Sequence, residues 1–277
     1  MTRNAVGRLS RGALALLRAG ALAAPLAFAS VSPALAGPPF LTDDPEPVPH
    51  HHYELYTFRT ADISSLGHSV SGPSIEFNAG ILRNVQFHLV APYAVFAPPG
   101  LARTSGYGDT EVGLKVRFVQ ETANRPQVGI FPMAEIATGD ASKGLGNGRT
   151  WYRVPVWIQK SWGPWKTYGG GGVALNNAPG AQNYGFAGWL VQRDLSSKFT
   201  LGAEVFTQGP NAAGGRGSTY YNVGGYYNPS TQLNVLWSVG HTFVGERHAV
   251  QYFGLYYTFP RPTEAAAADE HPTVPPK

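Results

Sequence analysis

The sequence of 277 residues contains no cysteine. This absence excludes disulfide bonds, thiol catalysis and metal sites with cysteine ligands. Charge is also scarce, since Asp, Glu, Lys and Arg make up only 14% of the residues. A soluble protein of this size carries nearer ~25% charged residues. The chain is instead rich in glycine, with 34 residues, and in aromatic side chains, at 12%. This composition suits a chain that faces both lipid and water.

The first 36 residues differ from the rest. Four arginines occur among the first 18 residues, an alanine- and leucine-rich run covers 21–29, and Pro33-Ala34-Leu35-Ala36 follows. A basic start, a short apolar core and small residues at the exit are the parts of a cleaved secretory signal peptide. The apolar core is too short for a spanning helix, which needs ~20 residues.

The charge balance changes once this signal is set aside. The full chain has 21 Lys and Arg against 17 Asp and Glu, a net charge of +4. The four arginines of the signal account for the whole excess, so the 241 residues after position 36 are neutral. A neutral mature chain gives no reason to expect nucleic acid as a partner.

The remaining chain is a series of short segments with period-two alternation. In Thr110–Phe118, the residues Val112, Leu114, Val116 and Phe118 alternate with Glu111, Gly113, Lys115 and Arg117. Side chains of a strand alternate between faces, so this pattern predicts a sheet between two different environments. We predict twelve strands, with ten or fourteen as the nearest other counts, at 51–60, 72–80, 85–96, 109–119, 127–137, 152–162, 166–176, 184–193, 199–207, 218–227, 233–242 and 248–259.

The connections between these strands alternate in length. They are expected at 61–71, 81–84, 97–108, 120–126, 138–151, 163–165, 177–183, 194–198, 208–217, 228–232 and 243–247. Outer-membrane barrels have long loops on the outside, short turns on the periplasmic side and an even number of strands. The sequence therefore predicts an all-β fold, a transmembrane antiparallel up-and-down β-barrel of about twelve strands over 51–259. Residues 37–50 would form a periplasmic lead segment and 260–277 a flexible C-terminal tail.

Aromatic residues support this topology. Trp162 and Trp165 flank a predicted periplasmic turn, and Tyr93 and Tyr152 are placed near predicted outer ends. Such rings favour the membrane interface, although ordinary packing of strand aromatics is the alternative. The last strand ends in Gly254-Leu-Tyr-Tyr-Thr-Phe259, which resembles the signal read by the barrel-assembly machinery, but here a tail of 18 residues follows it.

A resemblance to a known family rests on four further motifs. They are Gly106-Tyr-Gly-Asp-Thr-Glu-Val-Gly-Leu-Lys-Val-Arg-Phe118, Phe40-Leu-Thr-Asp-Asp-Pro45, Thr138-Gly-Asp140 with Gly144 and Gly146, and Gln159-Lys160 followed by Trp162-Gly163. Together they resemble an outer-membrane family named for the meta (MetA) pathway of phenol degradation. The resemblance implies a transporter-like barrel of this size, with these motif residues: Gly106, Gly108, Asp109, Gly113, Lys115, Phe118, Thr138 and Gly139. This chain has Ala137 where the family usually has proline.

Ionisable side chains of the strands are expected to face the lumen, because lysine or arginine at the lipid midplane costs ~2–4 kcal/mol. They could line a path for solutes or fill the barrel as ion pairs. The lumen-lining candidates are Glu54, Glu76, His88, Glu111, Lys115, Arg117, Glu135, Arg153, Gln159 and Glu204.

Twelve strands give a width between a barrel filled by side chains and an aqueous pore. The glycine-rich loop 138–151 is the best candidate for folding inward, with an ordinary surface loop as the alternative. The run His50-His51-His52 does not indicate a metal site, because neighbouring residues of a strand point to opposite faces. No cofactor is expected.

The sequence thus predicts an outer-membrane channel or transporter for passive passage of small solutes, aromatic or hydrophobic ones among them. Its partners would be membrane lipid, the barrel-assembly machinery and those solutes. A barrel with a plugged lumen and a structural or adhesive role is the alternative. A lipid-modifying enzyme is a further alternative, but Ser238 and His241 are three apart in one strand and so should lie on opposite faces. The last alternative is a soluble β-sandwich protein of the periplasm.

Overall fold

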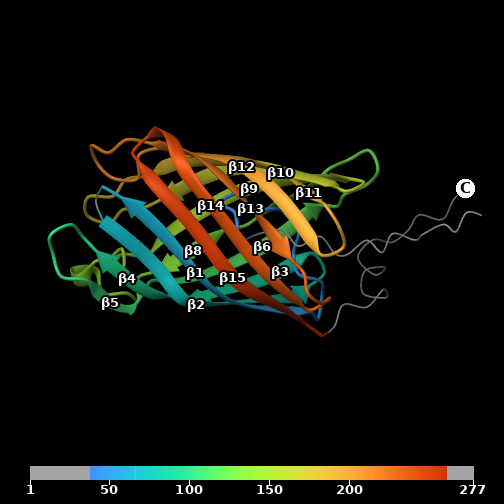
Figure 1. Cartoon of the computed structure of the whole chain (residues 1–277), viewed down its shortest axis with the longest axis horizontal. Helices are drawn as coiled ribbons and strands as arrows, with labels where there is room; N and C mark the ends of the chain where they lie inside the picture. The colour runs from blue at the N-terminus through green and yellow to red at the C-terminus, as the bar shows by residue number, and fades with distance from the viewer. Residues whose placement is uncertain (1–37, 66, 261–277) are drawn as a thin grey trace, which may run out of the picture. The chain divides into compact units, whose positions relative to one another are not determined.

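The computed structural model describes residues 38–65 and 67–260, which form a closed antiparallel barrel (Figure 1). The predicted signal peptide and all but the first residue of the predicted C-terminal tail lie outside the described residues. The elements are β1 (Tyr53–Ser64), β2 (Gly67–Leu82), β3 (Val85–Ala91), β4 (Tyr93–Ala97), β5 (Thr104–Tyr107), β6 (Thr110–Val119), β7 (Gln127–Ile130), β8 (Met133–Ile136), the short 3₁₀ helix η1 (Ala141–Lys143), β9 (Trp151–Trp162), β10 (Trp165–Leu175), β11 (Tyr184–Asp194), β12 (Phe199–Gln208), β13 (Ser218–Tyr227), β14 (Leu233–Gly245) and β15 (His248–Phe259).

These fifteen segments make the twelve strands that the sequence predicts. Three strands are interrupted, so that β3 and β4, β5 and β6, and β7 and β8 each form one strand in two parts. Pro92 and Pro132 lie at two of the breaks, where a residue without a backbone N–H cannot donate to the ladder. Within the described residues, no helix has the length and apolar character needed to cross a membrane.

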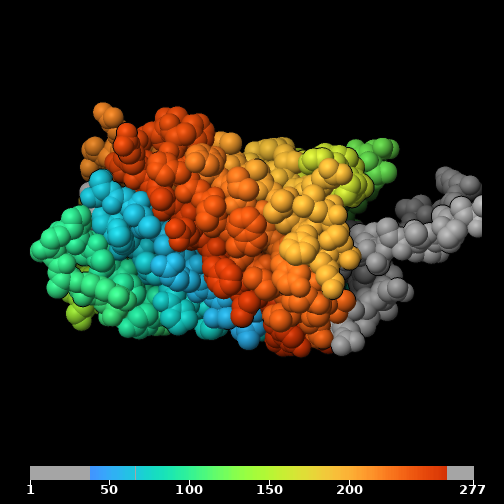
Figure 2. All heavy atoms as spheres, viewed as in Figure 1, coloured from blue at the N-terminus to red at the C-terminus, as the bar shows by residue number. Residues whose placement is uncertain are grey.

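Closure comes from β1, which pairs with both β2 and the last strand, β15. Tyr53 lies opposite Phe259 in that seam, so the first strand begins where the last one ends. Figure 2 shows the strands β14 and β15, in orange and red, running obliquely across one face beside the blue of the first strands. The wall is therefore closed around its circumference.

The two faces of the wall follow the predicted alternation. In β12, Thr200 and Glu204 are buried on the lumen side, while Leu201 and Val205 face outward and are 42% and 49% exposed. The outer face carries many such exposed apolar side chains. Trp162 and Trp165 are likewise exposed at the β9–β10 turn. An apolar outer band with aromatic residues at its ends is what lipid around a barrel favours.

The prediction of a long loop at 61–71 is wrong, because most of these residues belong to β1 and β2. The ladder between β1 and β2 continues to the pair Ser64 and Gly67, so that only two residues of sequence separate the paired positions. The polar residues Asp62 and Ser69 indicated a loop, but they are paired within this ladder. A polar strand end is acceptable where strands extend beyond the lipid into water. The predicted difference in length holds for 137–150, 176–183 and 209–217 at one end of the barrel, which are longer than 163–164, 195–198 and 228–232 at the other end. It does not hold for 98–103, which is shorter than 120–126, or at 243–247, where only 246–247 separate β14 from β15.

Candidate functional site

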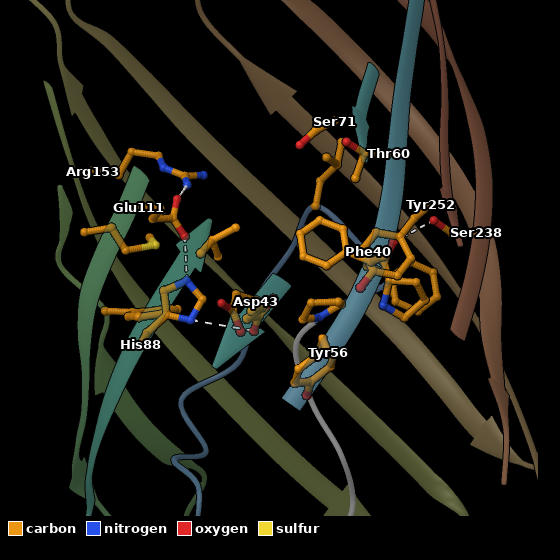
Figure 3. Close-up of a pocket in the computed structure, with 18 of the residues that line it drawn as sticks. Phe40, Asp43, Tyr56, Thr60, Ser71, His88, Glu111, Arg153, Ser238 and Tyr252 are labelled. Carbon is orange, nitrogen blue, oxygen red and sulfur yellow. Dashed lines mark hydrogen bonds and ion pairs between the residues drawn. The ribbon is translucent and has the colours of Figure 1, made fainter. Parts of the chain in front are cut away.

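A cavity of about 660 Å³ lies inside the barrel. Its wall is formed by strand residues and by residues 38–50, called here the lead segment. Figure 3 shows two sides of this space, with Phe40, Tyr56 and Tyr252 on one side and His88, Glu111 and Arg153 on the other. A volume of this size is in the range of small-molecule sites, ~300–1,000 Å³.

The lead segment enters the lumen, where the sequence predicted a periplasmic position. On the wall formed by the first strands, the Val48 N–H donates to Gln86 Oε1 at 2.8 Å. On the wall formed by the later strands, the N–H groups of Leu41 and Thr42 each donate to the carboxylate of Glu204 at 2.8 Å. The segment thus contacts β3 and β12, which contribute different parts of the wall.

Further polar side chains of the wall hold this segment. Lys115 Nζ lies 2.9 Å from Asp43 Oδ1 and 3.6 Å from Asp44 Oδ2. Gln159 Nε2 donates to Glu46 Oε2 at 2.8 Å. Thr42 and Asp44 have no exposed surface. Ordered polar contacts along its length fix the segment in place within the barrel.

Proline explains how this segment can be buried without regular structure. Five of the residues 38–50 are proline, and each proline lacks the backbone donor that would otherwise need a partner. Local carboxylates accept two of the remaining N–H groups, since Asp44 N donates to Asp43 Oδ1 and Glu46 N donates to Asp44 Oδ1. Side chains therefore accept most of the backbone N–H groups in 40–48, where no ladder is present.

Glycines in the wall make room for the segment. A Cβ atom at Gly188 in β11 would overlap Thr42 Oγ1. A Cβ atom at Gly202 in β12 would come within 3.1 Å of Phe40 Cζ, and one at Gly129 in β7 within 3.0 Å of Pro45 Cβ. The segment packs directly against the backbone of the wall at these glycines.

A network of charged and polar side chains lines one side of the cavity. His88 Nε2 lies 2.7 Å from Glu111 Oε1, and His88 Nδ1 lies 2.7 Å from Asn78 Oδ1. Arg153 forms an ion pair with Glu111 and approaches Glu135 Oε1 at 3.3 Å. Strands β2, β3, β6, β8 and β9 contribute to this network. The members of this network bind one another across the five strands.

Aromatic rings line the other part of the cavity. Trp157, Phe186, Phe206 and Tyr220 follow one another across β9, β11, β12 and β13, with neighbouring ring centroids 6.2–6.4 Å apart. These four residues are called here the aromatic row, and all of them line the cavity. Ring distances in this range are those of aromatic pairs in protein cores. The lumen is thus partly apolar.

The structure places the ten predicted lumen residues on the inner face, but not all of them at the cavity. Seven line it, namely Glu54, Glu76, His88, Glu111, Lys115, Glu135 and Arg153. Gln159 and Glu204 are buried against the lead segment. Arg117 is buried beside Asn84 and Gln127, with Nη2 2.8 Å from Asn84 Oδ1.

Sequence reasoning missed the aromatic row and the lead segment. The row could have been found by extending the strand alternation, because Phe206 is two residues from the inward Glu204 and shares its face. The lead segment has no such signal. Its partners lie 38 to 199 residues away along the chain, and no local pattern of the segment indicates them.

Several of the motif residues meet at the base of the loop 137–150. Asp109 Oδ1 accepts the N–H of Gly139 at 2.9 Å, and Asp109 Oδ2 accepts the N–H of Asn147 at 2.6 Å. Thr138 Oγ1 donates to the carbonyl of Gly108 at 2.8 Å. Leu145 is buried against Gly106. The loop is thereby fastened to the ends of the strands.

The other motif residues have separate places. Gly113 allows close contact with Phe131, Lys115 binds the lead segment, and Phe118 is 59% exposed on the outer face. At the tip of the loop, a hydrogen bond from Ser142 lowers the pKa of Asp140. The loop was the predicted candidate for folding inward, but the residues that enter the cavity wall are those of the lead segment.

The enzyme alternative gains no support from the geometry of Ser238 and His241. Ser238 is buried on the lumen side and donates to the carbonyl of Pro39 at 2.6 Å, whereas His241 is exposed on the other face. Among the described residues, no group of three or more His, Asp or Glu side chains is arranged to hold a metal ion.

Comparison with known proteins finds similarity at the level of the fold. No model of a known protein family matches the sequence, and no curated protein matches it. Among solved structures, the COG4313 outer membrane channel from Pseudomonas putida F1 superimposes with a TM-score of 0.62 and 13% identity, covering 78% of this chain and 98% of that one.

Two porins are also similar. The NanC porin has a TM-score of 0.53 and 8% identity, covering 73% of this chain and 98% of its own. The KdgM porin, solved in complex with disordered oligogalacturonate, has a TM-score of 0.53 and 11% identity, covering 74% of this chain and 99% of its own. The chain therefore has the fold of outer-membrane β-barrels.

Proposed function

We propose that the protein is an outer-membrane channel through which small solutes pass passively, aromatic and other hydrophobic compounds among them. The observation that carries this proposal is the cavity of about 660 Å³ inside a closed twelve-stranded barrel. Its lining combines the aromatic row with a polar network, so that a solute with a ring and a polar group finds contacts for both. The fold similarity to a channel and to porins supports the same role.

The proposal includes the location of the protein in the outer membrane and the way in which it reaches that membrane. A signal peptide in residues 1–36 delivers the chain to the periplasm, and the barrel-assembly machinery inserts it into the outer membrane. The sequence motifs around Asp109 resemble the family named for the meta pathway of phenol degradation. That resemblance supports aromatic compounds as solutes.

The lead segment favours a second candidate function. It crosses part of the lumen and is held by Glu204, Lys115 and Ser238. If the segment closes the passage completely, no solute passes, and the protein has a structural or adhesive role in which the outer loops bind other molecules or surfaces. The ordered loop 137–150 would then be the functional surface.

Swelling of liposomes that contain the refolded protein separates these two functions. The solutes run from small sugars to the zwitterionic amino acids leucine and phenylalanine, which cross lipid slowly without protein. A channel of the proposed kind swells the liposomes, and phenylalanine enters faster than leucine. Folding is checked by heat-modifiable mobility on a gel, and empty liposomes are the control. Folded protein that admits no solute contradicts the channel and favours the second function.

A further inference from the structure

Negative charge dominates the wall of the cavity. Eight Asp and Glu side chains line it, against one lysine and one arginine. Within a narrow passage, fixed charges of one sign attract ions of the opposite sign and exclude those of the same sign. The sign of the lining therefore bears on which solutes can enter.

Both cations of the lining are already neutralised. Lys115 Nζ lies 2.9 Å from Asp43 and 3.6 Å from Asp44, both in the lead segment. Arg153 is paired with Glu111 and with Glu135. Each cation thus has two carboxylates for its single charge. Neither is available to attract an anionic solute.

Glu54 in β1 is different, because its hydrogen-bond partners are neutral. Its carboxylate accepts hydrogen bonds from Tyr256 Oη at 2.8 Å, Tyr56 Oη at 3.1 Å and Asn78 Nδ2 at 3.2 Å. No described lysine, arginine or histidine lies within ion-pair distance of it. Neutral donors orient a carboxylate but do not cancel its charge. Among the described residues, Glu54 therefore lines the cavity as a carboxylate without an ion-pair partner of its own.

Aromatic rings lie beside this carboxylate. Tyr56 stacks on Tyr256 with ring centroids 4.4 Å apart, and Phe58 stacks on Tyr252 at 5.3 Å. Tyr56, Phe58 and Tyr252 line the cavity together with Glu54, and Figure 3 shows Tyr56 and Tyr252 on the same side of it as Phe40. Aromatic faces attract cations, and organic cations are bound in proteins by such rings.

We propose that this cavity selects organic cations that carry an aromatic or other apolar group. Glu54 provides the charge that recognises the cation, and Tyr56, Phe58 and Tyr252 provide the apolar wall. The inference rests on the proposed channel function and names the class of solute for the same cavity. It separates solutes that are alike in size and ring but opposite in charge.

The test is ion selectivity of the full chain in planar lipid bilayers. Two permanently charged probes of similar size are compared, benzyltrimethylammonium and benzenesulfonate, each as the replacing ion in a bi-ionic measurement of the reversal potential. We expect a permeability for benzyltrimethylammonium at least tenfold higher than for benzenesulfonate. Equal permeabilities, or a preference for benzenesulfonate, overturn the inference and leave the channel function standing. Folded protein without any conductance overturns the channel function and the inference with it.

Variants test whether Glu54 carries the selectivity. Glu54→Gln keeps the size and the hydrogen-bond acceptor but removes the charge, and should lower the permeability ratio at least threefold. Glu54→Asp keeps the charge and should retain most of the preference. Asp140→Asn, in the outer loop and away from the cavity, is the matched control and should leave the ratio unchanged.

Glu76 provides a second variant in case Glu54→Gln does not fold. Glu76 also lines the cavity, 3.6 Å from His88 and 2.9 Å from Asn78 Nδ2. If Glu54→Gln fails to give heat-modifiable protein, Glu76→Gln is measured in its place and should also lower the ratio. Folded variants of both kinds with an unchanged ratio overturn the assignment of selectivity to these carboxylates.

Discussion

The carboxylate of Glu204 accepts the backbone N–H of Thr42 at 2.8 Å, across 162 residues of sequence. The same carboxylate also binds the N–H of Leu41 and the side-chain amide of Asn222. One buried side chain of β12 thus holds the lead segment at the point where that segment reaches the later strands. Hydrogen bonds to a charged acceptor contribute ~1.5–3 kcal/mol each.

Loss of this charge should release the lead segment. We predict that Glu204→Gln makes a cysteine introduced by Thr42→Cys react about 10 to 100 times faster with a small methanethiosulfonate reagent. The chain has no native cysteine, so the label reports this position alone. Glu121→Gln, in the connection between β6 and β7, is the control and should not change the rate. An equally slow reaction in the Glu204→Gln background would show that other contacts suffice.

A side chain at Gly188 should displace the lead segment by steric overlap. We predict that Gly188→Val raises single-channel conductance at least twofold, because the space it needs is occupied by Thr42. Gly185→Val is the matched control in the same strand, since the nearest atom to a Cβ there is 3.8 Å away. Unaltered conductance in folded Gly188→Val protein would mean that the segment does not narrow the passage.

The two arginines of the predicted lining should behave differently. Arg153 lines the cavity and pairs with Glu111 and Glu135, whereas Arg117 is buried beside Asn84 away from it. We predict that Arg153→Met shifts the reversal potential in a KCl gradient further toward the potassium potential. Arg117→Met should leave it within a few millivolts of the wild type. Equal shifts in the two variants would contradict this placement.

The aromatic row should favour solutes that contain a ring. We predict that Phe206→Leu together with Trp157→Leu lowers the ratio of phenylalanine to leucine entry about two- to fivefold in liposome swelling, because contacts between aromatic rings contribute ~0.5–1.5 kcal/mol beyond their area. Phe243→Leu changes a ring on the outer face that is 57% exposed and should not alter the ratio. A preference kept by the double variant would place ring recognition elsewhere.

Asp109 should control the order of the loop 137–150. We predict that Asp109→Asn speeds hydrogen exchange at the amides of Gly139 and Asn147 about 10 to 100 times, since each loses a hydrogen bond to a charged acceptor worth ~1.5–3 kcal/mol. Exchange in loop 209–217 of the same protein is the internal control. Uniform acceleration in both loops would indicate a general loss of stability instead.

The strands could be predicted from the sequence because a barrel wall imposes a local pattern. Segments such as Ser218–Tyr227 and His248–Phe259 have the predicted bounds, since alternation and turn residues both act over a few neighbouring positions. The same rule failed at 61–71, where polar residues belong to strand ends that extend past the apolar band. The polar composition of this stretch reflects its exposure to water, although its residues are paired in a β-ladder.

The interior could be predicted only in part. Alternation places Glu54, Glu76, Glu111 and Arg153 on the inner face, as the structure does. It does not tell which inner residues meet the cavity and which meet the lead segment, because that depends on where residues 38–50 run. Their path is fixed by contacts with Gln86, Lys115, Glu204 and Ser238, which are distant in sequence.

Several contacts of the lead segment join residues that are synthesised early to residues that are synthesised late. Residues 38–50 are made before any strand, but Glu204 and Ser238, which hold them, belong to the last third of the sequence. The seam partner of β1 is later still, since β15 is the final strand. Gln86 and Lys115, which contact the middle and end of the lead segment, are made early, but the partners of Pro39, Leu41 and Thr42 and the seam partner of β1 are made late. Docking of the start of the segment and sealing of the wall are therefore late events in folding, and both need the last third of the chain.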